Sequence, residues 1–123
     1  MKNQIVWVDI PVINLERAIS FYAKVLDGIV TKENGDAGII FGLLPHDEGN
    51  VSACLFTTSD NEPSQKGPLI YLNAEGRLAN ALEIAKKEGG KVLQEIHQVG
   101  QFGYRVIIVD TEGNRIALHS FTR

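Results

Sequence analysis

The sequence predicts a small α+β (α/β) protein built from two tandem βαβββ modules. Strand and helix patterns occur twice in the order β-α-β-β-β, on either side of a polar stretch at residues 59–67 (SDNEPSQKG). The tripeptide Glu-Gly-Asn occurs at residues 48–50 and again 64 residues later (112 − 48), each time just before the last strand of a module. A spacing of this length indicates an internal duplication. We therefore predict one domain of 123 residues, with module one at 1–58, a linker at 59–67 and module two at 68–123.

The first module begins with a strand at residues 5–10 (IVWVDI), rich in β-branched and aromatic side chains. A helix follows Asn14, a favourable N-cap residue, and ends at Gly28. Its apolar residues recur at helical spacing: Leu15, Ala18, Ile19, Tyr22 and Leu26. The remaining predicted strands are 29–31, 38–44 and 51–57, with a tight turn at Asn34-Gly35 and a loop at 45–50.

The second module repeats this order. A strand at 69–74 precedes a helix at 78–87, and strands follow at 91–96, 104–109 and 115–120. Lys86 and Lys87 lie in the last turn of this helix, where positive charge is favourable. Leu78 lies 63 residues after Leu15 (78 − 15), so the two helices begin at equivalent points of the two copies.

Composition excludes several functions and locations. The formal net charge is −3 and no segment gathers Lys and Arg, which argues against a nucleic-acid partner. No apolar run approaches the roughly 20 residues that span a bilayer, so we expect no membrane association. The first residues lead directly into a predicted strand, so we expect no signal peptide. The sequence has a single cysteine, so we expect no internal disulfide. We therefore expect a cytoplasmic protein. We also expect a homodimer, because pairing between subunits would cover the exposed sheet edges.

Several segments resemble the vicinal oxygen chelate (VOC) superfamily of glyoxalases, bleomycin resistance proteins and dioxygenase-like proteins. They are residues 7–12 (WVDIPV), 15–18 (LERA), 21–22 (FY), 67–73 (GPLIYLN), 89–92 (GGKV), 110–116 (DTEGNRI) and 118–120 (LHS). The nearest branch comprises small glyoxalase-related proteins of uncertain function. The resemblance implies a curved mixed sheet with a half-barrel cleft. It also implies a divalent metal held by His, Glu or Gln from the first and last strand of each module.

The positions that hold this metal in the family fall here on Trp7, Ala53, Leu69 and Ala117. None of these side chains binds a divalent cation. We therefore expect the usual metal site to be absent and no cofactor to be required. A divalent metal held by Asp9 and His119 is retained as an alternative.

Strand alternation indicates which side chains face the cleft. If Trp7 and Ala117 face it, apolar residues on the same strands, such as Val6, Val8, Ile10, Ile116 and Leu118, pack under the helices. The predicted ligand-binding residues are Trp7, Asp9, Tyr71, Asn73, Arg115 and His119. A few polar groups in an otherwise apolar cleft are typical of a small-molecule site.

Each candidate has a functional and a structural interpretation. His119 is a candidate general base or metal ligand, or a hydrogen-bonded histidine at a strand end. Asp9 is the second catalytic candidate and would orient His119, or it is a solvated carboxylate. Trp7 stacks on a ligand or packs at an interface, and Tyr71 donates its hydroxyl to a ligand or is structural. Cys54 is predicted to be a buried free cysteine.

Three functions follow from these observations. The first is binding of a small organic molecule in the cleft without the usual metal. The second is a metal-dependent lyase or isomerase related to lactoylglutathione lyase, with a site relocated to Asp9 and His119. The third is a structural or regulatory dimer without chemistry. Whether the protein is an enzyme stays open. The loops at 45–50, 59–67 and 98–103 are expected to shape the cleft, and the loop at 98–103 is predicted to cover its mouth. His46 and His97 are predicted to lie on the surface.

Overall fold

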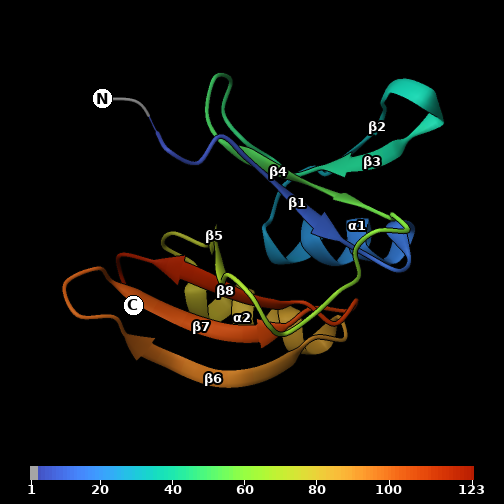
Figure 1. Cartoon of the computed structure of the whole chain (residues 1–123). Coiled ribbons are helices and arrows are strands. Elements are labelled where there is room, and N and C mark those ends of the chain that lie inside the picture. The colour runs from blue at the N-terminus through green and yellow to red at the C-terminus, as the bar shows by residue number, and fades with distance from the viewer. Residues whose placement is uncertain (1–2) are drawn as a thin grey trace.

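A computed structural model describes residues 3–123 and confirms the predicted order of elements. The first module consists of β1 (Trp7–Pro11), α1 (Leu15–Val25), β2 (Thr31–Asn34), a 3-10 turn (Asp36–Gly38), β3 (Ile40–Leu43) and β4 (Ser52–Phe56). The second consists of β5 (Ile70–Asn73), α2 (Leu78–Lys87), β6 (Lys91–Gln98), β7 (Tyr104–Val109) and β8 (Arg115–Ser120). Figure 1 shows the first module in the upper half of the molecule and the second in the lower half.

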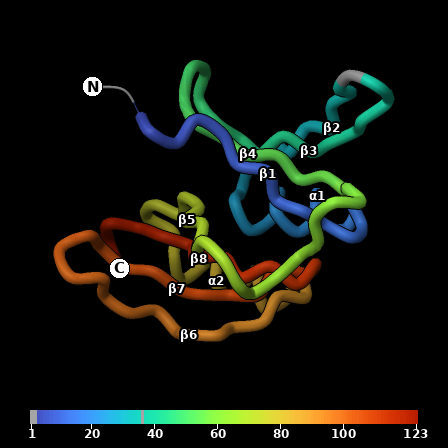
Figure 2. Tube along the Cα trace, viewed as in Figure 1, coloured from blue at the N-terminus to red at the C-terminus, as the bar shows by residue number. Residues whose placement is uncertain are grey.

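Each module forms its own four-stranded sheet, and the two sheets have the same topology. The strand orders are β1-β4-β3-β2 and β5-β8-β7-β6. In each sheet the first strand is parallel to the last, and the other pairs are antiparallel. The duplication and the α+β fold class are thereby confirmed. β1 and β5 are edge strands, and the linker that joins the modules runs between the sheets in Figure 2.

The inner face of each sheet packs against the helix of its own module, and the two helices contact each other. One apolar core therefore runs through both modules. Its fully buried side chains include Tyr22 of α1, Leu55 of β4, Ala81 of α2 and Leu118 of β8. The alternation predicted for the last strand is confirmed, because Ile116 and Leu118 lie in this core.

The two helices begin differently. Asn14 caps α1 as predicted, since its side-chain oxygen accepts a hydrogen bond from the backbone N–H of Arg17 at 3.0 Å. Arg77 precedes α2 without a side-chain cap. Within the described part of the chain, α1 and α2 have 11 and 10 residues, and no helix is long and apolar enough to cross a membrane.

The structure differs from the sequence-based expectation near β1 and β2. β1 begins at Trp7, so Val6 is 74% exposed instead of packing under a helix. β2 spans Thr31–Asn34, so it begins two residues after the predicted start at Ile29. Asn34-Gly35 does not form a two-residue hairpin turn, because the Gly35 N–H donates to the carbonyl of Ile39 at 2.6 Å and closes a longer loop.

The orientation of β4 corrects the position predicted for Ala53. Ala53 pairs with Val8 on the inner face and is 4% exposed, whereas Cys54 pairs with Asp9 on the outer face. The first inner residue of the strand lies five residues after Glu48 (53 − 48) but only four after Glu112 (116 − 112). One extra residue in the first copy turns every side chain of the strand to the opposite face. The repeated tripeptide therefore does not fix the register of β4.

The turn between β7 and β8 ties the second module to the start of α1. The carboxylate of Glu112, whose side chain is fully buried, accepts hydrogen bonds from the backbone N–H groups of Ile13 and Asn14 at 2.8 and 2.7 Å. It also pairs with the guanidinium of Arg17 at 2.7 Å. Burial opposes ionisation, but these donors prevail and lower the pKa of Glu112 to about 2.

The carboxylate of Asp110 holds the backbone of the same turn through hydrogen bonds. Its Oδ1 accepts the backbone N–H groups of Glu112, Gly113 and Asn114 at 2.8, 2.9 and 2.9 Å. Its Oδ2 accepts the hydroxyl of Tyr22 on α1, a side chain with no exposed surface. Burial and the nearby Asp110 carboxylate raise the pKa of Tyr22 well above its ordinary value, so the phenol remains a donor.

Candidate functional site

The outer face of the second sheet carries a cluster of polar and aromatic side chains on an apolar base. Tyr71, Arg105 and His119 project from β5, β7 and β8, on the face opposite the core residues of those strands. On the same face, Ala117 and Ile107 are paired neighbours and are 0% and 7% exposed. This face therefore carries oriented donors and acceptors, and the half-exposed ring of Tyr71, above a covered apolar layer.

Arg105 lies at the centre of the cluster. Its Nε–H donates to His97 Nε2 at 2.9 Å, and its Nη1 donates to the Tyr71 hydroxyl. The guanidinium carbon lies 5.7 Å from the centroid of the Tyr71 ring. Arginine always donates, so His97 Nε2 carries the lone pair, and the ring is the neutral tautomer whose Nδ1–H donates to the carbonyl of Glu95 at 2.8 Å.

His119 joins the cluster to the loop between β6 and β7. Its Nε2 lies 2.6 Å from the carbonyl oxygen of Phe102, so this nitrogen carries a proton and donates. The ring packs edge-on against Phe121, with centroids 4.8 Å apart, and lies 6.0 Å from Tyr71. The 98–103 loop therefore reaches the outer face through the backbone of Phe102.

The outer face of the first sheet carries Trp7, Asp9 and Cys54. Cys54 is a free cysteine, 7% exposed, and its Sγ donates to Asp9 Oδ1 at 3.3 Å. Burial is the main cause that raises the pKa of Cys54 to about 11. Trp7 is 43% exposed on the same face.

The thiol of Cys54 should therefore react slowly in the native protein. At pH 8 a pKa of about 11 leaves about a hundredfold less thiolate than the ordinary value of 9.0. We expect a disulfide reagent such as dithiobis(nitrobenzoate) to label the native protein at least about 100-fold more slowly than the urea-unfolded chain. Asp9→Asn should speed native labelling, because the carboxylate contributes to the raised pKa. Equal rates for native and unfolded protein would contradict this assignment.

The structure places the six predicted site residues in four locations. Tyr71 and His119 lie together on the second sheet, and Trp7 and Asp9 lie together on the first. Asn73 Oδ1 accepts the N–H of Glu75 at 2.8 Å and shapes the turn into α2. Arg115 turns toward the linker, where its Nη2 lies 3.4 Å from the carbonyl of Gly67 and its side chain lines a small cavity of about 220 Å³.

Asp9 and His119 are not brought together within one chain. Asp9 contacts Cys54 on the first sheet, and His119 contacts Phe102 on the second. The relocated metal site of the lyase hypothesis requires both residues at one point, so the geometry of a single chain does not assemble it.

Sequence reasoning missed Arg105. It is the only charged residue of β7 (YRVIIV), whose burial rises from its first residues to its last. Alternation along that strand would have placed Arg105 on the same face as Ile107, opposite the core residues Val106 and Ile108. A single arginine in an otherwise apolar central strand is the signal that could have identified it.

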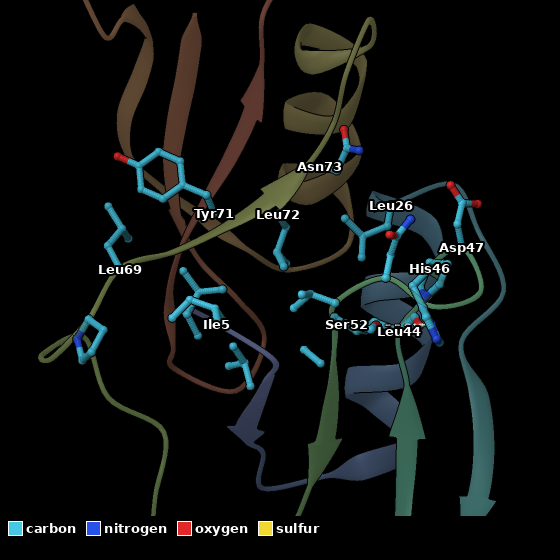
Figure 3. A pocket seen from close by; sticks show the side chains of 17 residues that line it. Ile5, Leu26, Leu44, His46, Asp47, Ser52, Leu69, Tyr71, Leu72 and Asn73 are labelled. Carbon is cyan, nitrogen blue, oxygen red and sulfur yellow. Dashed lines mark hydrogen bonds between the residues drawn. The ribbon is translucent and has the colours of Figure 1, made fainter. Parts of the chain in front are cut away.

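A groove of about 840 Å³ lies between the modules, near the edge strands β1 and β5 (Figure 3). Its floor is apolar and includes Leu26, Leu44 and Leu72, and its rim carries His46 and Asp47. Large apolar side chains at its margin are exposed: Ile5 at 61%, Val51 at 37% and Tyr71 at 45%. The groove therefore exposes apolar surface beside two unpaired strand edges.

The side chains at the family's metal-ligand positions do not fit a divalent metal. With β4 in its observed orientation, those positions on the outer faces are Trp7, Cys54, Leu69 and Ala117. Of these four side chains, only that of Cys54 has an atom that can coordinate a metal, and its raised pKa keeps the thiol protonated. Within residues 3–123, no group of three or more His, Cys, Asp or Glu side chains is arranged to hold a metal ion.

The fold and the two outward-facing sheets define a protein of the glyoxalase-like class. The family model described as the Glyoxalase/Bleomycin resistance protein/Dioxygenase superfamily matches residues 4–118. The chain belongs to this superfamily, as the resemblance of its segments implied. None of the curated proteins matches the chain.

Several solved structures have the same fold. A glyoxalase/bleomycin resistance protein from Albidiferax ferrireducens has a TM-score of 0.75 at 16% identity, with 96% of this chain and 98% of that chain covered. A glyoxalase-related enzyme from Fulvimarina pelagi has a TM-score of 0.70 at 14% identity, covering 97% and 88%. A glyoxalase/bleomycin resistance protein/dioxygenase family enzyme from Burkholderia phytofirmans has a TM-score of 0.70 at 15% identity, covering 94% and 96%. At these identities the likeness shows the fold alone.

Proposed function

We propose that the protein binds a small organic molecule on the outer face of the second sheet, without the usual metal of the superfamily. The observation that carries this proposal is the hydrogen-bonded arrangement of Tyr71, Arg105 and His97 beside His119. These side chains are oriented by one another in advance of binding, which lowers the entropic cost of binding a ligand. The exposed rings of Tyr71 and Phe121 supply apolar surface beside it.

A second copy of the chain is proposed to close the site. β1 and β5 have unpaired edges, and apolar side chains are exposed around the groove between them. Association along these edges would bury that surface. It would also bring the first sheet of one copy, with Trp7 and Asp9, beside the second sheet of the other.

A thermal-shift screen of small organic acids, amides and aromatic compounds tests the binding proposal. A ligand that binds the native state must raise the melting temperature. Because His119 lies at the outer-face cluster and His46 at the groove, His119→Gln and His46→Gln form a matched pair. We expect His119→Gln to abolish the shift and His46→Gln to preserve it. Loss of the shift in His46→Gln alone would place the ligand in the groove and contradict the proposal.

Sedimentation velocity tests the association of two copies. We expect a dimer at micromolar concentration, with emission from Trp7, the only tryptophan, moving to shorter wavelength as dimer forms. Val51→Asp, at the groove margin, should weaken association by at least about tenfold, since it places a charge in the apolar interface. Ile29→Asp is the control, because Ile29 is 79% exposed and does not line the groove. A monomer at all concentrations would contradict association.

A further inference from the structure

We propose that the ligand carries a carboxylate or another oxyanion and that Arg105 binds this group directly. This inference deepens the proposed function and rests on it. It assigns to the outer face a class of ligand, an apolar or aromatic acid, and a residue that determines specificity.

The charge of Arg105 is not neutralised within the described part of the chain. Its hydrogen-bond partners, the neutral His97 ring and the Tyr71 hydroxyl, carry no negative charge. The ion pairs of residues 3–123 involve other cations: Arg17, Lys24, Lys32 and Lys86. Glu95 lies on the neighbouring strand β6. The negative charge of its carboxylate attracts the ammonium group of Lys86 on α2 and helps to raise the pKa of that lysine. A half-buried guanidinium held among neutral groups is an arrangement that favours an incoming anion.

The hydrogen bonds of Arg105 leave donors available in a useful geometry. A guanidinium has five N–H groups, and His97 and Tyr71 engage the one on Nε and one on Nη1. The other donor of Nη1 and both donors of Nη2 have no partner among the described residues. Two parallel donors on Nη1 and Nη2 match the two oxygens of a carboxylate or phosphate. His97 and Tyr71 therefore fix the orientation of the guanidinium and leave both donors of Nη2 for an oxyanion.

The surroundings of Arg105 define the rest of the ligand. The guanidinium lies over the Tyr71 ring, and the same ring lies beside His119, which packs against Phe121. Ile107 and Ala117 form the apolar base of the cluster. A flat apolar group would pack on the exposed rings of Tyr71 and Phe121 while its acidic group pairs with Arg105. The other arginine of this sheet, Arg115, turns away toward Gly67 and does not join the cluster.

Titration of the 123-residue chain with benzoate and benzamide, followed by NMR, tests the inference. The two molecules have nearly the same shape, but only benzoate is charged. We expect benzoate to bind at least about tenfold more tightly than benzamide and to shift the Nε–H resonance of Arg105. Arg105→Gln should remove this preference, and Arg115→Gln should preserve it. Arg105→Lys, which keeps the charge but loses the planar fork, should retain part of it.

Several results would overturn the inference. One is equal affinity of the native protein for benzoate and benzamide, a comparison that needs no variant. Another is an unchanged benzoate affinity in a folded Arg105→Gln protein. A third is no response of the cluster to benzoate, phenylacetate or phenyl phosphate at about 20 mM, well above the millimolar affinity of a weak fragment. If neutral compounds bind with dependence on His119, the proposed function stands and only the anionic ligand class fails. If no compound of either kind binds, both proposals fail.

Discussion

Replacing Glu112 by glutamine should destabilise the fold by about 3 kcal/mol, because it removes the charge that joins the two modules. The fully buried carboxylate accepts from Ile13 N–H, Asn14 N–H and Arg17 at once. An amide has one acceptor oxygen and places two donors among groups that already donate. Urea denaturation at pH 7, followed by circular dichroism, measures this loss as a lower midpoint with an unchanged slope.

The contribution of Glu112 should disappear in acid. Its pKa is about 2 in the folded protein and 4.5 ordinarily, so the ionised carboxylate stabilises the fold fully above pH 4.5. This stability is lost as pH falls from 4.5 toward 2, because the folded state must then take up a proton that the unfolded chain already holds. The difference in unfolding free energy between the native protein and Glu112→Gln should shrink over this interval, and urea titrations at several pH values measure it.

Glu48 provides the matched control. It occupies the same place in the first Glu-Gly-Asn tripeptide but is exposed, and among residues 3–123 it forms no ion pair like that of Glu112 with Arg17. Glu48→Gln should change stability by less than about 0.5 kcal/mol at any pH. Equal effects of the two substitutions would show that the buried ion pair is not the cause.

Asp110→Ala should have the largest effect of any single substitution in the turn, about 4 kcal/mol. It leaves the N–H groups of Glu112, Gly113 and Asn114 without their acceptor and deprives the buried Tyr22 hydroxyl of its partner. It also loosens the backbone that presents Glu112 to α1, so the effects of the two substitutions should not add. Thermal and urea unfolding of both single variants and of the double variant measure this coupling.

Two further variants separate the parts of this prediction. Tyr22→Phe keeps the ring in the core but removes the hydroxyl, and should cost about 1–3 kcal/mol. Asp47→Ala changes the exposed aspartate that begins the equivalent turn of the first module, and should be nearly neutral. A large loss in Asp47→Ala together with a small one in Asp110→Ala would contradict the proposed role of the second turn.

The fold was predictable because its signals are local. Asn14 caps α1 through its own side chain, and the strand pattern of Ile70–Asn73 alternates with the period of two that a half-buried sheet requires. The register of β4 was not predictable from the repeated tripeptide. One extra residue after Glu48 turns each side chain of the strand to the other face, so that Cys54, and not Ala53, lies on the outer face.

The candidate site was only partly predictable. Alternation placed Tyr71 and His119 on one face, and the structure brings them within 6.0 Å between ring centroids. The contacts that orient Arg105 depend on the pairing of β6 with β7, where two irregularities shift the register before His97 reaches Arg105. Such bulges follow from three-dimensional packing and leave no regular pattern in the sequence.

The sequence by itself determined the order of elements, the duplication and the superfamily, since these depend on local periodicity and on motifs of fixed spacing. Only the tertiary structure decided what the two Glu-Gly-Asn tripeptides do. The same three residues are exposed at 48–50, whereas at 112–114 the glutamate is buried against the N-terminus of α1 and pairs with Arg17. The difference arises because burial and partners, which come from distant parts of the chain, set the free energy of a carboxylate.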